Sequence, residues 1–235
     1  MSLFGISDLH LSSKVNKPMD VFGGVWENYM EKIKTNWEKT VGENDTVIVP
    51  GDISWATYMD EATDDFVFLS KLKGRKLILK GNHDYWFETA AKLENRLKEL
   101  DINNISLIHN GFGVYENTAI CGTKGGDVTR PPSSENGKKL ENREAMRLER
   151  SILAAKNEGF NDIIAFLHYP PVLKYGKYND NPFTNILKKY EIKKCFYGHL
   201  HSKAHKIALC EQFNGTEYQL ISADFINFSP FLIKM

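Results

Sequence analysis

The sequence has few cysteines and no excess of either charge. Its three cysteines are Cys121, Cys195 and Cys210, and no two of them form a Cys-x-x-Cys pair. An odd number of widely spaced cysteines argues against a disulfide framework and against a thiolate zinc site, so we expect free thiols in a reducing compartment. The formal net charge is zero. The overall charge therefore gives no electrostatic reason to expect binding to nucleic acid or to an anionic membrane.

Long hydrophobic runs are also missing. No stretch approaches the roughly 20 apolar residues of a membrane span. The segment beginning Leu3-Phe4-Gly5-Ile6 has neither the basic nor the apolar region of a signal peptide. We therefore expect a cytoplasmic protein that does not contact membranes. The 235 residues are 42% hydrophobic and 26% charged, which is ordinary for a globular protein and suits a single domain spanning residues 1–235.

The first hundred residues alternate between two kinds of apolar pattern. The segments expected to be strands are 3–7, 46–49 and 75–79, and those with the apolar spacing of helices are 20–41, 60–73 and 90–100. Strands that alternate with helices predict a parallel sheet with helical crossovers.

The rest of the chain adds shorter strands and two long loops. Strands are expected at 105–109, 113–115, 118–121, 162–167 and 194–197, and antiparallel tail strands at 206–213, 217–221 and 231–233. We interpret 105–121 as an antiparallel or mixed extension of the sheet. A charged helix is expected at 138–158, and its arginines are interpreted as a solvated face, with an anion-facing rim as the alternative. Loops 123–137 and 169–182 are long enough to be functional.

Polar side chains gather at the ends of five of the apolar runs. The five clusters are Asp8 with His10, Asp52 alone, Asn82 with His83 and Asp84, His168 alone, and His199 with His201. Each cluster taken singly is common in surface turns, but together they contain five of the seven histidines in the chain. The carboxyl ends of parallel strands meet at one edge of a sheet, where α/β proteins place their active sites. We therefore expect these side chains to form one site.

The residue types in these clusters suit a two-metal site. Oxygen and imidazole ligands without a thiolate favour Mn, Fe or Zn. A lone carboxylate such as Asp52 can bridge two cations about 3.5–4 Å apart, and metal binding lowers the pKa of water from ~15.7 towards ~7. Two divalent cations outweigh the charges of Asp8, Asp52 and one hydroxide by about one unit, which suits a phosphoester anion.

The ordered set of motifs resembles the calcineurin-like metallophosphoesterases, and in particular their small bacterial-type phosphohydrolases. The matching segments are Asp8-Leu9-His10, Gly51-Asp52, Gly81-Asn82-His83-Asp84, His168 and Gly198-His199-Leu200-His201. The resemblance implies an α/β (α+β) fold, a four-layer αββα sandwich of two mixed β-sheets flanked by helices. It also implies a cofactor of two divalent metal ions and a small phosphoester as substrate.

The resemblance assigns a role to each motif residue. Asp8, His10 and His201 would hold one metal ion, Asn82, His168 and His199 would hold the other, and Asp52 would bridge the two. His83 would protonate the leaving oxygen and be oriented by Asp84. A metal-bridging hydroxide would attack phosphorus in line, and the ester could be a phosphomonoester or a phosphodiester.

Two motifs depart from the protein Ser/Thr phosphatase branch. That branch has Gly-Asp-x-x-Asp-Arg-Gly and an arginine after its Asn-His-Glu, whereas this sequence has Trp55 after Gly51-Asp52-Ile53-Ser54, and Tyr85 after Asp84. Phosphoprotein phosphatase activity is therefore not expected. One alternative is a nuclease of the same superfamily, which would need a basic groove. Another is a catalytically idle scaffold for protein–protein contacts. The sequence leaves the oligomeric state open.

Overall fold

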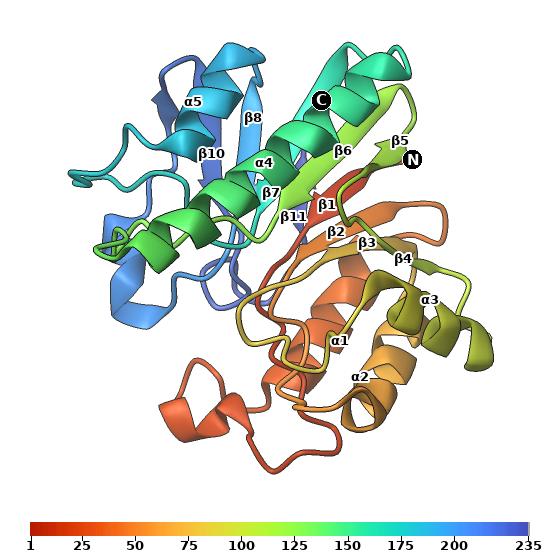
Figure 1. Cartoon of the computed structure of the whole chain (residues 1–235). Helices are drawn as coiled ribbons and strands as arrows, with labels where there is room; N and C mark the ends of the chain where they lie inside the picture. Colours follow the sequence, from red (N-terminus) through yellow and green to blue (C-terminus); the bar gives the residue numbers. More distant parts are fainter. Residues whose placement is uncertain (235) are drawn as a thin grey trace. The chain divides into compact units, whose positions relative to one another are not determined.

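The computed structural model describes residues 1–234, which divide into two compact units. The first unit comprises Met1–Leu107 and the C-terminal segment from Ile221 onward, and the second comprises Ile108–Leu220. Each unit contains one β-sheet with helices packed along it (Figure 1). Among the described residues, no helix is both long enough and apolar enough to cross a bilayer.

The first unit contains a five-stranded mixed sheet with the strand order β11-β1-β2-β3-β4. The strands are β1 Leu3–Gly5, β2 Thr46–Pro50, β3 Arg75–Leu79, β4 Ile105–Leu107 and β11 Phe231–Ile233. Strands β1 to β4 pair in parallel, and β11 pairs antiparallel with β1. The parallel arrangement predicted for the first three strands is therefore confirmed, and their carboxyl ends lie at one edge of the sheet.

Three helices cover this sheet: α1 Tyr29–Thr40, α2 Met59–Lys71 and α3 Ala90–Glu99. Residues at helical spacing, such as Ile33 and Trp37 on α1 and Phe66 and Leu69 on α2, are fully buried in the core of this unit. Burial of this kind is worth roughly 1.5–3 kcal/mol for each large side chain. These side chains therefore serve the packing of the core.

The first helix is shorter than the sequence predicted. Residues 20–41 were expected to form one helix, but a short 3-10 helix at Met19–Phe22 is separated from α1. Gly23 and Asn28 adopt positive φ angles of 88° and 51°. A left-handed residue cannot continue a right-handed helix, so these two positions interrupt it.

The second unit contains a six-stranded mixed sheet with the order β5-β6-β7-β8-β10-β9. The strands are β5 Phe112–Tyr115, β6 Thr118–Thr123, β7 Asp162–Leu167, β8 Lys194–Tyr197, β9 Gln212–Phe213 and β10 Thr216–Leu220. β6, β7, β8 and β10 are parallel, and β5 and β9 are antiparallel edge strands. The helices of this unit are α4 Glu135–Asn157 and α5 Pro182–Lys189.

Several expectations for this half of the chain need correction. Only β4 extends the first sheet, whereas β5 and β6 belong to the second sheet, because β6 pairs with β7. Of the tail strands, β9 and β10 pair antiparallel as expected, but β10 also pairs with β8 in parallel. The strand expected at 206–213 is limited to Gln212–Phe213, and its first two residues belong to the 3-10 helix Ser202–Ile207. The predicted fold class, two mixed sheets flanked by helices, is confirmed.

Candidate metal-ligand residues

The first unit brings three of the sequence motifs to neighbouring strand ends. Asp8 and His10 follow β1, Asp52 follows β2, and Asn82 follows β3. Backbone hydrogen bonds join the first two loops, because the amide of Asp8 donates to the carbonyl of Gly51 at 3.1 Å and the amide of His10 donates to the carbonyl of Asp52 at 2.9 Å. The pairing of β1 with β2 therefore continues into the loops that carry the polar side chains.

Three of these residues have an unusual backbone conformation. Asp8, His10 and Asp52 have φ angles of 61°, 47° and 51°. Left-handed backbone is uncommon outside glycine and costs roughly 1–3 kcal/mol per residue. All three side chains are also buried, at 0–2% exposure. Strain and buried charge at one place are typical of a functional site rather than of a folding requirement.

The carboxylate of Asp52 lies against the backbone of the loop after β3. A Cβ atom added to Gly81 would lie 2.1 Å from Oδ1 of Asp52 and 2.3 Å from its backbone nitrogen. Only glycine admits such an approach. The same Oδ1 accepts a hydrogen bond of 2.8 Å from the amide of His83. The loop after β3 therefore fixes the orientation of the Asp52 carboxylate.

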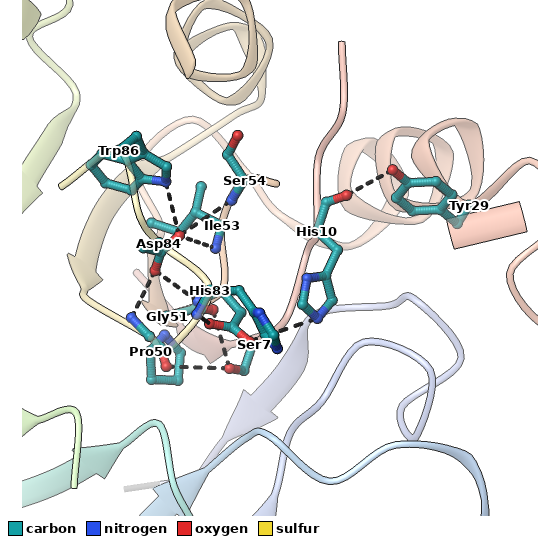
Figure 2. Close-up of polar contacts among 12 residues, drawn as sticks. Ser7, His10, Tyr29, Pro50, Gly51, Ile53, Ser54, His83, Asp84 and Trp86 are labelled. Atoms are coloured by element: carbon teal, nitrogen blue, oxygen red, sulfur yellow. Dashed lines mark hydrogen bonds and ion pairs between the residues drawn. The ribbon is translucent and has the colours of Figure 1, made fainter. Parts of the chain in front are cut away.

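Asp84 links the loops after β2 and β3. Its buried carboxylate accepts five hydrogen bonds of 2.7–3.3 Å, from the backbone amides of Gly81, Asp52, Ile53 and Ser54 and from Nε1 of Trp86 (Figure 2). Hydrogen bonds to an ionised acceptor are the strong ones. Asp84 thus holds the loop that carries Asp52 in place. That Asp84 also orients His83 stays a prediction.

The separation of His10 and Asp52 is compatible with a shared cation. Nε2 of His10 lies 3.8 Å from Oδ2 of Asp52, and both side chains are buried. This distance exceeds a direct hydrogen bond of about 2.7–3.2 Å. Two metal–ligand bonds of about 2.0–2.2 Å each would span it. The donor set in this unit therefore fits a divalent metal ion.

Two residues outside the predicted motifs support the loops of this unit. Asp65 on α2 accepts hydrogen bonds from Oγ of Ser54 at 2.5 Å and from the amide of Ser13 at 2.9 Å, and its burial raises the pKa of its carboxyl. Tyr29 donates from its hydroxyl to the carbonyl of His10 at 2.7 Å, and burial raises its pKa to about 12. The sequence signal for Asp65 was an acidic residue on the apolar face of a helix.

The second unit carries the three remaining histidines of the motifs. His168 follows β7, and His199 and His201 follow the neighbouring parallel strand β8. The amide of Gly198 donates to the carbonyl of His168 at 3.0 Å, and the ring centroids of His168 and His199 are 5.3 Å apart. Tyr169 packs against His199 at 4.3 Å. His199 has a φ angle of 72°, so the left-handed conformation recurs here.

The predicted site residues therefore fall into two groups. Six lie on the first unit and three on the second. The first group contains acidic, amide and imidazole side chains and the second contains imidazoles alone, and in both groups these side chains follow neighbouring parallel strands. This arrangement is typical of metal-dependent hydrolases with an α/β fold.

The sequence matches the family model described as calcineurin-like phosphoesterase over residues 1–203, and the chain belongs to this family. The matched range contains every motif residue of both groups. Family membership makes metal-dependent hydrolysis of a phosphoester the activity class of the protein. No curated protein matches the sequence significantly.

Solved structures give a consistent but more distant comparison. A protein of unknown function from Aquifex aeolicus is 18% identical, with a TM-score of 0.55 and coverage of 98% of this chain and 95% of that one. The phosphopantetheinyl hydrolase of Mycobacterium tuberculosis is 17% identical, with a TM-score of 0.57 and coverage of 99% and 95%. A Thermus thermophilus protein, TT1561, is 15% identical, with a TM-score of 0.51 and coverage of 86% and 82%. At these identities the likeness shows the fold.

Proposed function

We propose that the protein uses two divalent metal ions, of Mn, Fe or Zn, to hydrolyse a small phosphomonoester or phosphodiester. The observation that carries the proposal is the Asp52 carboxylate, which is buried beside His10 and held by the loop after β3. That loop can approach the carboxylate so closely only because residue 81 is glycine. Burying an unpaired charge costs free energy of folding. Burial of these groups together is therefore not explained by folding stability. In this proposal both units belong to one domain of residues 1–235.

The two groups of ligands would act together. Asp8, His10 and His201 would hold one ion, Asn82, His168 and His199 the other, and Asp52 would contact both. Support comes from the family match, which spans both groups, and from the donor chemistry. Carboxylate, amide and imidazole ligands suit Mn, Fe and Zn alike, so the identity of the metal stays open.

His83 is the proposed general acid. When bound, the metal ions would supply a hydroxide nucleophile at neutral pH and stabilise charge on the phosphoryl oxygens. His83 would donate a proton to the leaving oxygen. Its backbone is fixed by the hydrogen bond to Asp52, and its ring is packed against Trp55 at 4.5 Å. The imidazole of His83 is fixed in position but only half-buried. It can therefore transfer a proton to a group that enters from solvent.

The proposal is tested by hydrolysis assays on the purified protein loaded with Mn²⁺. With 4-nitrophenyl phosphate and bis(4-nitrophenyl) phosphate as model substrates, we expect metal-dependent turnover of at least one of them. His83→Ala should lower kcat by roughly 10²–10⁴-fold. The loss should be larger for phenyl phosphate, because its more basic leaving group depends more on a general acid. His109→Ala, which changes a histidine outside the motifs, is the matched control.

Two outcomes would count against the proposal. Absence of turnover with Mn²⁺, Fe²⁺ and Zn²⁺ on every ester tested would favour the idle scaffold. Cleavage restricted to DNA or RNA, with binding that weakens steeply as salt rises, would favour the nuclease. Retention of full activity in His83→Ala would remove the general-acid role alone.

A further inference from the structure

Trp55 lies against two of the imidazoles in the first unit. Its ring is stacked on His10 with centroids 4.5 Å apart and an interplanar angle of 18°, and it is tilted against His83 at 4.5 Å and 55°. The His10 and His83 rings are themselves 5.8 Å apart. One indole therefore contacts both a proposed metal ligand and the proposed general acid.

The backbone on both sides of Trp55 is held in place. Its amide donates to the carbonyl of Leu11 at 2.9 Å, and the amide of Leu11 donates to the carbonyl of Ile53 at 2.9 Å. Ser54 accepts a hydrogen bond from the amide of Ala56 at 3.1 Å and donates one to Asp65. These bonds fix the main chain from which the indole projects, so the ring has a defined position beside His10 and His83.

The polar atom of the indole does not determine where the ring lies. Nε1 of Trp55 is buried and has no hydrogen-bond partner within residues 1–234, whereas buried tryptophans normally find one. Trp86, two residues beyond Asp84, has such a bond. Ring packing, which includes the stacked contact with His10 and the tilted contact with His83, therefore determines the position of the Trp55 ring.

We propose that Trp55 is a positioning residue that keeps the imidazoles of His10 and His83 at a fixed separation. The inference rests on the proposed function, in which His10 binds metal and His83 donates a proton. An imidazole rotates about two side-chain bonds, and a flat ring packed against it removes much of that freedom before metal or substrate binds. Aromatic rings in contact prefer stacked or edge-to-face geometries, and such contacts stabilise more than burial of the same area alone.

The test compares Trp55→Phe with Trp55→Leu, because both substitutions remove Nε1 and only phenylalanine keeps a ring face. Dissociation constants for Mn²⁺ are measured by calorimetry, and kcat and KM are measured with the better model ester. For Trp55→Leu we expect Mn²⁺ binding to weaken and kcat to fall, each by about tenfold, as the loss of aromatic contacts predicts. KM should change by less than about twofold, and Trp55→Phe should recover most of both losses.

A purely space-filling role predicts different results. Leu69→Ala removes a fully buried side chain of α2 and serves as a control for lowered stability. If Leu69→Ala lowers the melting temperature as much as Trp55→Leu and weakens Mn²⁺ binding equally, the inference is overturned. Equal behaviour of the phenylalanine and leucine variants would overturn it too. Wild-type protein that binds none of Mn²⁺, Fe²⁺ and Zn²⁺ would instead remove the proposed function, and this inference with it.

Discussion

Substitution of Asp84 by asparagine tests whether one carboxylate holds the loops after β2 and β3 together. Oδ2 of Asp84 accepts from the amides of Asp52 and Gly81, and Oδ1 accepts from the amides of Ile53 and Ser54 and from Nε1 of Trp86. Asparagine keeps nearly the same shape but replaces one oxygen by an NH₂ group. Whichever way the amide is turned, two or three N–H groups then face another donor.

The size of the effect follows from these contacts. A buried donor left without an acceptor costs about 1–3 kcal/mol, and the substitution affects at least two donors. Partial relaxation and entry of water reduce the sum, because neighbouring losses are not additive. We therefore expect Asp84→Asn to lower the free energy of unfolding by about 3–5 kcal/mol. Because Asp52 is one of the residues released, Mn²⁺ affinity should fall by at least about tenfold.

Urea unfolding gives the stability change, and calorimetry gives the metal affinity. Asp101→Asn is the matched control, because Asp101 is exposed and its positive φ angle of 52° is one that asparagine tolerates. That control should change stability by less than about 0.5 kcal/mol. A loss below about 1 kcal/mol in Asp84→Asn, with unchanged Mn²⁺ binding, would refute the organising role of Asp84.

Three further perturbations test other parts of the first unit. Gly81→Ala should reduce stability by about 1–3 kcal/mol through overpacking and weaken Mn²⁺ binding by displacing Asp52; native-like binding in this variant would contradict the close approach. Tyr29→Phe removes the hydrogen bond to His10 and should cost about 1–2 kcal/mol in urea unfolding. Burial lowers the pKa of Lys76 from 10.5 to about 8. The folded state then binds fewer protons than the unfolded state between these values, so stability should rise with pH from about 8 towards 10, by up to about 1.4 kcal/mol per unit. Lys76→Met should abolish this rise, and a rise that persists would show that another group causes it.

The sequence predicted the positions of the motifs better than the bounds and pairing of the helices and strands. Asp8, Asp52 and His168 follow short apolar runs, and such runs are local signals that need no knowledge of the rest of the fold. The start of α1 was wrong because the left-handed turn at Asn28 outweighs the apolar spacing before it. The assignment of β5 and β6 to a second sheet depends on pairing with β7, a contact between distant segments that periodicity does not encode.

The supporting residues of the site were harder to foresee. Asp65 and Ser54 are 11 positions apart, and their hydrogen bond depends on how α2 packs on the sheet. In the sequence, Trp55 differs from other positions only as a departure from one branch of the family. Its contacts with two imidazoles depend on three loops meeting, and no single stretch of sequence contains that information.

The first sheet is assembled from both ends of the chain, with residues 108–220 inserted between them. β11 pairs with β1, and the same C-terminal segment reaches Ser7, whose amide donates to Ile221 and whose carbonyl accepts from Ala223. Ser7 immediately precedes Asp8. The backbone hydrogen bonds that support the start of the Asp8 loop can therefore form only after residues 221–223 have been synthesised. Chains that lack residues 221–234 would have an uncovered β1 edge, a known hazard for aggregation, and we expect them to be inactive.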